Sequence, residues 1–240
     1  MTNPTAAMLV IGDEILSGRT RDSNMHHLAQ QLTERGITLA EVRVVPDDQT
    51  AIVAAVNALR AAHTHVFTSG GIGPTHDDIT ADAIAVAFGV AITQRADAMA
   101  LLGAHYARQG SAFNAARQRM ARIPDTATLI DNPVSIAPGF TVGNVHVMAG
   151  VPRIFEAMLA GVLAGITGGA PLLSRTLRVL KGEGDIATAF AAFAARHPDL
   201  AMGSYPFNVN GSFGTNLVLR GTDAARLDAA LVALTTLLET

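Results

Sequence analysis

The chain has 240 residues, of which 49% are hydrophobic and 15% are charged, so it is not an intrinsically disordered protein. Its 17 basic and 20 acidic residues give a net charge of −3, which argues against a protein that coats nucleic acid. The sequence contains no cysteine, which excludes disulfide frameworks, thiol catalysis and cysteine-ligated metal centres. No apolar stretch has the length of a signal sequence or a membrane span, so we expect a soluble cytoplasmic protein without a membrane or nucleic-acid partner.

The first part of the chain alternates between strand and helix patterns. Apolar runs predict buried strands at residues 6–11, 37–45 and 65–68. Helical periodicity follows each run, between Ser23 and Gly36 and then over residues 51–62 and 81–88. The first helix is expected to bury Met25, Leu28, Ala29 and Leu32, and Thr50 and Thr80 are expected to cap the other two. This order predicts a parallel sheet with helices on both faces.

The rest of the chain is less regular and ends in a separate small unit. The pattern predicts a helix with a break, a loop, a hairpin and a further helix, at residues 95–122, 132–139, 140–148 and 152–165. A turn-rich linker at residues 167–171 follows, after which the chain reads strand, helix, two strands and helix. We therefore predict two domains, residues 1–170 and 171–240, the second a small α+β unit of βαββα order.

Three pairs of acidic residues carry most of the functional signal. Each pair follows one of the first three predicted strands: Asp13-Glu14, Asp47-Asp48 and Asp77-Asp78. Because ligands of parallel sheets bind beyond the carboxyl ends of the strands, we expect all six carboxylates at one edge. A divalent cation would relieve their repulsion, and oxygen ligands favour Mg²⁺ or Mn²⁺. Acidic residues before a helix are also ordinary caps, so each pair has this second interpretation.

A glycine-rich segment, Gly70-Gly71-Ile72-Gly73, lies between the third predicted strand and the helix at residues 81–88. Glycines at such a place let backbone N–H groups turn toward an anion, and the dipole of the next helix favours a phosphate. A tight turn that only requires positive φ is the alternative. Since Asp77 and Asp78 adjoin the loop, a phosphate bridged by a metal or a bound cation is the hypothesis that accounts for both features.

Several stretches of the sequence resemble a known family. They lie at residues 11–18, 22–24 and 69–80, and the match continues in order at 132, 137–139, 149–152, 182–185 and 203–206. The most specific piece reads Gly-Gly-x-Gly-Pro-Thr-x-Asp-Asp-x-Thr. Together these stretches resemble the competence/damage-inducible protein A (CinA-like) family and, more widely, the molybdopterin-binding domain of molybdenum-cofactor biosynthesis, similar to MoaB and Mog proteins.

The resemblance implies a three-layer α/β/α domain with a mostly parallel sheet that binds a phosphate-bearing pterin, such as molybdopterin, or a nucleotide. It implies catalytic and metal-holding roles for Asp47 and Asp78, the positions of two acidic residues in molybdopterin adenylyltransferases. Family members hydrolyse the pyrophosphate of ADP-ribose or a related dinucleotide with a divalent metal (Mg²⁺, Mn²⁺ or Co²⁺). Further substrate-binding residues are expected at Gly12, Asp13, Glu14, Asn24, Ser69, Gly70, Gly71, Gly73, Thr75, His76, Asp77, Thr80, Asn132, Gly150 and Pro152.

Two features set this sequence apart from the family. The family's Pro-Gly-Val-Pro-x-Glu-Met reads Ala-Gly-Val-Pro-Arg-Ile-Phe here, so Ile154 stands at the Glu position. Full-length bacterial members carry a nicotinamide-mononucleotide deamidase domain, which we expect to be absent because the sequence ends at Thr240. Three functions stay open: a metal-dependent nucleotide pyrophosphatase, a molybdopterin adenylyltransferase and a non-catalytic binder. The two-domain layout favours the first.

The remaining candidate residues are expected to be mostly structural. His26 and His27 are neighbours on one helix and are expected at its surface, which leaves His76 as the one histidine with a functional role. Three arginines, Arg117, Arg119 and Arg122, are expected on a solvated helix face. Low charge and abundant Ala and Leu leave apolar surface to cover, so we expect a homo-oligomer, with a dimer favoured, whose other partner is a small phosphate-bearing ligand.

Overall fold

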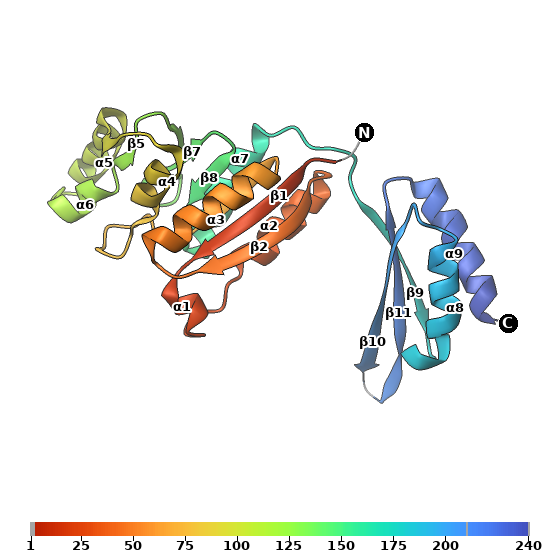
Figure 1. Cartoon of the computed structure of the whole chain (residues 1–240). Helices are drawn as coiled ribbons and strands as arrows, with labels where there is room; N and C mark the ends of the chain where they lie inside the picture. The colour runs from red at the N-terminus through yellow and green to blue at the C-terminus, as the bar shows by residue number, and fades with distance from the viewer. Residues whose placement is uncertain (1–2, 210, 240) are drawn as a thin grey trace. The chain divides into compact units, whose positions relative to one another are not determined.

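The structure is a computed structural model that describes residues 3–209 and 211–239 (Figure 1). The chain divides into two compact units, Met1–Gly169 and Ala170–Thr240. No helix in the described ranges is long and apolar enough to cross a membrane. The larger unit contains, in chain order, β1 (Thr5–Ile11), α1 (Asp13–Leu16), α2 (Asn24–Glu34), β2 (Thr38–Val45), α3 (Gln49–Ala62), β3 (His65–Ser69), α4 (Thr80–Phe88), β4 (Ile92–Gln94), α5 (Ala96–Arg108), α6 (Ala115–Arg119), β5 (Arg122–Pro124), β6 (Thr128–Ile130), β7 (Gly139–Val142), β8 (Val145–Met148) and α7 (Pro152–Ala164).

A six-stranded sheet in the order β2-β1-β3-β8-β7-β6 forms the centre of this unit. The four strands from β2 to β8 pair in parallel, and β7 pairs antiparallel with both β8 and β6. The antiparallel pair β7–β8 turns at Gly143-Asn144, which confirms the predicted hairpin. A separate two-stranded ribbon of β4 and β5 lies outside this sheet.

The strand β1 shows why the unit has three layers. It is buried on both faces, so its side chains divide between two apolar cores. Ala7, Leu9 and Ile11 join the core under α3, α4 and α5, whereas Met8 and Val10 join the core under α2 and α7. Helices therefore cover both faces of a mostly parallel sheet, as Figure 1 shows for α2 and α3, and the predicted α/β/α fold class is confirmed.

Details of several helix starts differ from the sequence prediction. The predicted cap Thr50 is wrong, because Asp48 caps α3 by accepting a hydrogen bond from the backbone N–H of Ala51 (2.8 Å). The predicted cap Thr80 is also wrong, since its hydroxyl donates to the Gly70 carbonyl instead.

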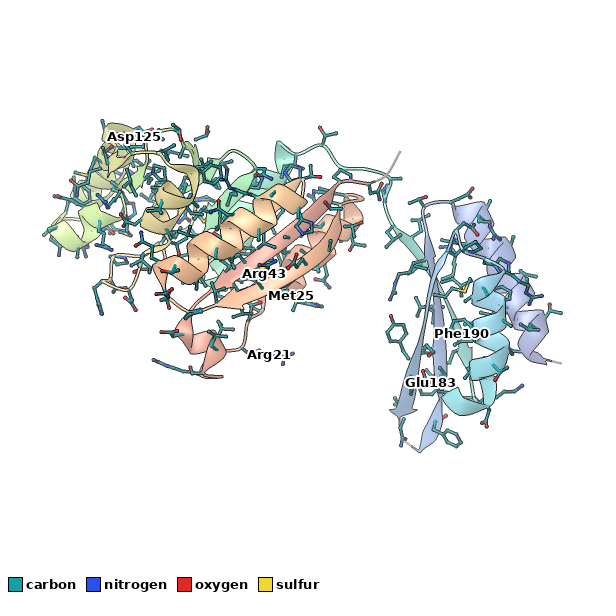
Figure 2. All side chains as sticks on the ribbon, in the orientation of Figure 1. Arg21, Met25, Arg43, Asp125, Glu183 and Phe190 are labelled. Carbon is teal, nitrogen blue, oxygen red and sulfur yellow. The ribbon has the colours of Figure 1, made fainter. Side chains whose placement is uncertain are left out.

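Met25, labelled in Figure 2, was expected inside but is 38% exposed beside the edge strand β2. The short strands β4, β5 and β6 were not predicted, because three residues carry too little periodicity.

Replacing Asp48 by Ala is expected to destabilise the protein without affecting ligand binding. Loss of this one cap bond costs about 1 kcal/mol, which corresponds to a melting-temperature decrease of roughly 2–4 °C for a domain of this size. Thermal unfolding followed by circular dichroism checks the expectation. Thr50→Ala is the control and should leave the melting temperature within 1 °C or so of the parent, since Thr50 makes no side-chain cap bond.

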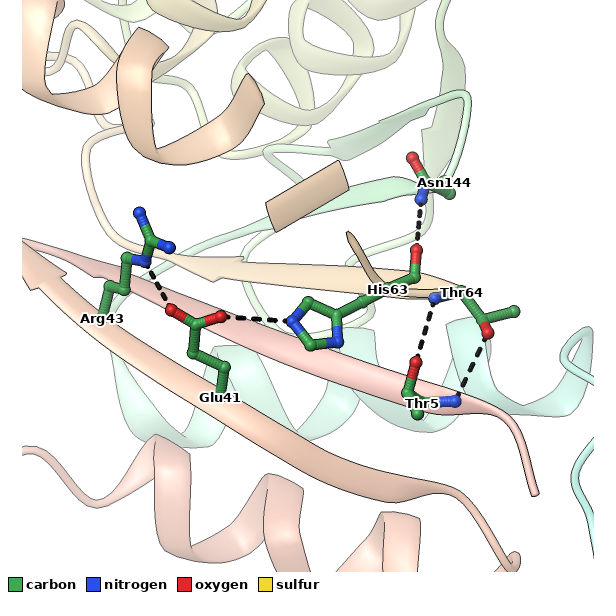
Figure 3. Close-up of polar contacts among 6 residues, drawn as sticks. All are labelled: Thr5, Glu41, Arg43, His63, Thr64 and Asn144. Carbon is green, nitrogen blue, oxygen red and sulfur yellow. Dashed lines mark hydrogen bonds and ion pairs between the residues drawn. The ribbon is translucent and has the colours of Figure 1, made fainter. Parts of the chain in front are cut away.

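A polar network links the edge strand β2 to the C-terminus of α3 and to the β7–β8 turn (Figure 3). The Glu41 carboxylate on β2 contacts both Arg43 (2.7 Å) and His63 (3.2 Å), and Arg43 lowers the pKa of Glu41. The side-chain amide of Asn144, in the β7–β8 turn, donates to the carbonyls of Arg60 and His63 at the end of α3. Asn144 therefore fixes the C-terminus of α3 against the hairpin, at the end of the sheet opposite to the acidic pairs.

Two histidines lie side by side within the sheet. Nε2 of His146 on β8 is 3.4 Å from Nδ1 of His65 on β3, and the Thr141 hydroxyl is 3.0 Å from the other ring nitrogen of His146. His146 is 8% exposed and its ring also contacts Phe67, with the two centroids 5.1 Å apart. Burial lowers the pKa of His146 to about 4, and the charge of His65 acts in the same direction. The folded protein therefore holds His146 neutral.

Acidification is expected to lower the free energy of unfolding through His146. Its pKa is about 6.5 in the unfolded chain and about 4 in the folded one, so the unfolded chain binds the extra proton between these values. The contribution of neutral His146 to the free energy of unfolding is complete above pH 6.5. As the pH falls from 7 to 5, this contribution decreases by about 2 kcal/mol. Urea unfolding at both pH values measures it. In His146→Gln, which does not titrate, this part of the decrease should vanish, and an unchanged decrease would contradict the assignment.

The small unit has the predicted βαββα order. Its elements are β9 (Leu173–Val179), α8 (Glu183–Ala195), β10 (Ala201–Val209), β11 (Ser212–Gly221) and α9 (Ala224–Glu239). The strands form an antiparallel sheet in the order β10-β11-β9, and both helices pack on one face of it. The core of this unit contains Ile186, Phe193, Leu217 and Leu227. It is independent of the two cores of the larger unit.

Candidate functional site

Acidic residues from three segments of the chain line one cavity at the carboxyl ends of β1, β2 and β3. The cavity has a volume of about 340 Å³. Its acidic lining residues are Glu14 after β1, Asp47 after β2, and Asp77 and Asp78 in the segment between β3 and α4. Arg19 is the one basic residue among its described lining residues, and the others are Ile11, Gly12, Thr20 and Gly71. We call this the acidic cavity. Asp13 and Asp48 do not line it.

Asp47 is held in place by the loop that follows β1. The backbone N–H of Asp13 donates to Asp47 Oδ2 (3.0 Å), and Oδ1 accepts no hydrogen bond from the described residues. Partial burial raises the pKa of Asp47, and the negative charges of Asp13, Glu14 and Asp77 raise it further, against the opposing hydrogen bond from Asp13. Asp47 is thus a carboxylate with one oxygen fixed, one oxygen available, and an increased affinity for a proton.

Asp78 is fixed in the same manner from within its own loop. Its Oδ2 accepts hydrogen bonds from both the backbone N–H (2.7 Å) and the hydroxyl of Thr75. Gly73 leaves room for this carboxylate, because a Cβ at Gly73 would lie 2.7 Å from Asp78 Oδ2. Thr75 therefore acts by positioning Asp78, although it does not line the acidic cavity itself.

The glycine loop has a conformation that other residues cannot adopt. Gly70 and Gly71 have φ of 111° and 67°. A Cβ on Gly70 would lie 2.1 Å from the Ile11 carbonyl oxygen, and one on Gly71 would lie 2.1 Å from the Thr80 hydroxyl. Thr80 supports the loop from beneath, since its hydroxyl donates to Gly70 O (3.1 Å) and its N–H to Gly71 O (3.0 Å). The positive φ values agree with the interpretation of the segment as a tight turn. The loop also lies between β3 and α4, a position at which backbone N–H groups commonly bind an anion.

A larger and more apolar cavity adjoins the acidic one. Its volume is about 530 Å³, and it shares Glu14, Thr20, Gly71 and Asp78 with the acidic cavity. Its side-chain lining is mostly apolar, from Ile72, Pro74, Met120, Val151, Pro152 and Ile154. We call this the apolar cavity. Ile154, which stands at the family's Glu position, contributes an apolar wall, so this chain offers no carboxylate there.

Asn132 lines the apolar cavity and Asn24 does not, and the two side chains differ in their hydrogen bonding. Asn132 lines it, but its Nδ2 donates to Ser135 Oγ and Ala137 O while its Oδ1 accepts from the N–H groups of Val134 and Ser135. The Asn132 side chain therefore uses its hydrogen-bonding groups to hold the conformation of the loop after β6. Asn24, at the start of α2, donates to Ser69 Oγ and Gly150 O, and its Oδ1 has no partner in the part of the chain that the structure describes.

The other predicted site residues are distributed around these cavities. Gly12 lines the acidic cavity, Gly150 and Pro152 line the apolar one, and Ser69 lies next to Asn24. His76 is placed differently from the expectation of a functional histidine inside the loop. The His76 side chain is fully exposed, and its Nδ1 lies 3.9 Å from Asp77 Oδ1. Neither cavity is lined by it.

The three arginines of the α6 region are not a solvated helix face, and that expectation is wrong. Arg119 donates from Nη2 to the Asp78 carbonyl (3.1 Å), and its Nε is buried without a partner among the described residues. Arg122 forms an ion pair with Asp82 on α4 (2.6 Å). Arg117 stacks on the Tyr106 ring, with its guanidinium carbon 4.3 Å from the ring centroid. Strand β5, which follows α6, packs against α4, and sequence spacing alone does not reveal this. Arg19, Thr20 and Arg119 are polar neighbours of the site that the sequence did not indicate.

The donor set suits a metal that also binds phosphate oxygens. Within residues 3–209 and 211–239, no group of three or more His, Asp or Glu side chains stands close enough to hold a metal by itself. Asp47 and Asp78 nevertheless line one cavity, each with an oxygen that the fixing hydrogen bonds leave unused. Mg²⁺ is commonly held by one or two carboxylates together with substrate phosphates and water, so two carboxylates fit this group.

Two sequence families match successive parts of the chain. Residues 7–173 match the family described as "probable molybdopterin binding domain", and residues 171–240 match the middle domain of FAD synthase. The second match concerns the small unit, which the sequence analysis had compared only with CinA-like proteins. The two matched segments meet where the chain passes from one compact unit to the other.

Curated relatives and a solved structure agree with these matches. The chain is 32% identical to a probable FAD synthase of Caenorhabditis elegans, over 98% of this chain and 50% of that protein, and 38% identical to a CinA-like protein of Citrifermentans bemidjiense, over 68% of this chain and 40% of that protein. It thus spans half or less of the length of these two relatives. The crystal structure of CinA from Thermoplasma acidophilum superposes with a TM-score of 0.62 at 33% identity, covering 68% of this chain and 98% of that one. With its larger unit matched almost throughout, this chain belongs to the molybdopterin-binding domain family, among its CinA-like members.

Proposed function

We propose that the larger unit binds a phosphate-bearing nucleotide at the carboxyl edge of its sheet and hydrolyses a pyrophosphate bond with a divalent metal. The observation that carries the proposal is the joint lining of one cavity by Asp47, Asp78 and Gly71 of the glycine loop. The adjoining apolar cavity has the volume and the apolar lining that a base requires. A phosphate chain would then lie over the acidic residues while the base packs against Ile72, Met120 and Ile154.

The two catalytic carboxylates have different parts in this proposal. Hydrolysis forms a bond between a water oxygen and phosphorus and breaks the bond to the bridging oxygen, so a proton leaves the water and the leaving phosphate takes the electron pair. Asp47 keeps one oxygen free of hydrogen bonds from the described residues, and the proposal uses this oxygen either to hold the metal or to take the proton of the attacking water. Asp78 is fixed by Thr75 and next to the glycine loop, which suits a residue that orients the phosphate end of the ligand.

A divalent metal bound at Asp47 and Asp78 would neutralise phosphate charge and lower the pKa of the attacking water. The remaining chemistry belongs to the chain itself. The Gly70 N–H donates to the Met148 carbonyl (3.2 Å), so the proposal assigns the phosphate contacts to the N–H groups of Gly71, Ile72 and Gly73. The start of α4 would add the favourable end of a helix dipole. Four carboxylates and one arginine line the acidic cavity, so a phosphate ligand without a cation is expected to bind poorly there.

Incubation of the purified protein with ADP-ribose and each of Mg²⁺, Mn²⁺ and Co²⁺ tests the proposal. The expected products are AMP and ribose 5-phosphate, separated by ion-exchange chromatography, and the reaction should stop when EDTA is added. ADP-ribose that stays intact with every metal, while binding is detected by calorimetry, would support the non-catalytic binder instead.

A second candidate is favoured by the match of almost the whole chain to a relative named as a probable FAD synthase. FAD contains the same kind of pyrophosphate bond between an adenosine and a second group. The site would then hydrolyse FAD, or it would transfer the adenylyl group of ATP to a phosphate-bearing acceptor. FMN and molybdopterin are the two acceptors to test. Supplying FAD with metal, and FMN or molybdopterin with ATP and metal, distinguishes these reactions through the release of AMP in the first and of pyrophosphate in the others.

A further inference from the structure

A small recess with both polar and apolar lining residues opens beside the two cavities. It has a volume of about 50 Å³, and Asn24, Ser69, Asp22 and Arg21 are among its lining residues. It shares Glu14, Thr20, Gly150 and Pro152 with the apolar cavity, and Glu14 and Thr20 with the acidic cavity as well. The recess therefore lies where the two cavities meet. Its size suits a hydroxyl group and the carbon that carries it, and it is too small for a fused ring.

Asn24, which lines the recess, carries an unsatisfied acceptor. Asn24 is 3% exposed, and its Nδ2 donates to Ser69 Oγ (2.8 Å) and to the Gly150 carbonyl (2.7 Å). Its Oδ1 is buried and has no hydrogen-bond partner among residues 3–209 and 211–239. The carbonyl of Gly150 fixes this orientation, because turning the amide over would place two acceptor oxygens against each other. Asn24 is thus held with an acceptor that only a donor group can satisfy.

The hydroxyl of Ser69 adds a second polar group with a defined direction. Its oxygen accepts from Asn24, so its hydrogen is left to donate. An acceptor and a donor side by side complement a group that both donates and accepts, and a sugar hydroxyl has both capacities. A carbonyl or an ether oxygen has only the acceptor capacity and would leave Asn24 Oδ1 unpaired.

We infer that Asn24 is a specificity-determining residue that binds a ribose hydroxyl, so that the ligand of this site is a ribonucleotide and not a deoxyribonucleotide. The inference rests on the proposed function, which places the base in the apolar cavity and the phosphates in the acidic one. In that arrangement the sugar lies between the two cavities, where the recess opens. The base itself is left unspecified by these contacts, since the apolar cavity offers it few polar side chains.

Calorimetric titration of the full chain with ADP, 2′-deoxy-ADP and 3′-deoxy-ADP, each with Mg²⁺, tests the inference. At least one deoxy compound should bind about tenfold more weakly than ADP, because it leaves a buried acceptor unpaired. Equal affinities for all three compounds, within about twofold, would overturn the inference and leave water as the occupant of the recess. The proposed nucleotide-binding function would still stand in that case.

The variant Asn24→Ala assigns the preference to this residue. It should bind ADP as weakly as the deoxy compound, so the ratio of their dissociation constants falls to about one. Asn144→Ala is the matched control, because Asn144 also donates to two acceptors, at the far end of the sheet. It should lose stability but keep the ratio of the parent. A preference that survives in a folded Asn24→Ala would contradict the role of Asn24.

Two further outcomes keep the test decisive. If Asn24→Ala does not fold by circular dichroism, the three titrations of the unchanged chain still decide whether the ribose hydroxyl is recognised. If neither ADP nor the deoxy compounds bind the unchanged chain, with or without Mg²⁺, nucleotide binding itself is refuted, and the ribose inference with it. Failure of the inference alone and failure of the proposed function are therefore separate results.

Discussion

Replacing Asp78 by Ala is expected to lower kcat/KM for the proposed hydrolysis by about a thousandfold or more while the fold is retained. The carboxylate is fixed by Thr75 at the junction of the acidic and apolar cavities, so its removal takes away charge at the place where phosphate and metal would be held. Losses of this order follow when one group of a preorganised charged site is removed. Steady-state kinetics with ADP-ribose and metal measures the effect.

The matched control for this variant is Asp125→Ala. Asp125 is exposed after β5, and it also accepts a hydrogen bond from a threonine hydroxyl, that of Thr93. Both variants therefore lose a similar contact, and both should keep the circular dichroism spectrum of the parent. Asp125→Ala should also keep its activity. If Asp78→Ala turns over substrate at the parental rate, Asp78 has no catalytic or metal-holding role, and Thr75 and Asp78 form only a turn.

Replacing Gly70 by Ala is expected to destabilise the protein by about 3–5 kcal/mol and to abolish ligand binding. At φ of 111° an L-residue is strained, and the new Cβ would lie 2.1 Å from a backbone oxygen of Ile11, which cannot rotate away as a side chain would. Relief requires the glycine loop to move off the end of β1. For a domain of this size, the melting temperature should fall by roughly 6–20 °C.

Gly89→Ala isolates the contribution of positive φ from that of the clash. Gly89 ends α4 with φ of 64°, and a Cβ there would meet no atom within 4 Å. Its replacement should cost only about 1 kcal/mol and leave binding unchanged. Similar losses of stability in the two variants would contradict the close approach of the loop to β1. Differential scanning calorimetry of both proteins makes the comparison.

The sequence predicted the parts of this fold that depend on local pattern. Continuous apolar runs identified β1 and β3, and the restart of the pattern after Gly169 identified the small βαββα unit. The turn Gly143-Asn144 identified the β7–β8 hairpin. Strands of three residues, such as β5 and β6, depend on partners elsewhere in the chain, so their own residues carry no recognisable period.

The candidate site was predictable in its composition but not in its connections. Acidic pairs after successive strands indicated the acidic cavity, since the carboxyl ends of parallel strands share one edge. The sequence did not indicate that Asp48 would turn away as a cap while Asp47 faces the cavity. It also did not reveal that Arg119 reaches the backbone of Asp78, because 41 residues separate them and β5 had first to pack against α4.

The bond between Asn24 and the Gly150 carbonyl joins residues 126 positions apart, so the recess closes only after β8 has been added beside β3. Contacts of such sequence separation form slowly, because much chain entropy is lost before they contribute any stability. Helices α2 and α3 rely on neighbouring residues and form sooner. During refolding, helical circular dichroism is therefore expected to recover before nucleotide binding does, and simultaneous recovery of the two signals would contradict this order. A newly made chain would thus pass through a stage in which it has its helices but cannot yet recognise a ligand.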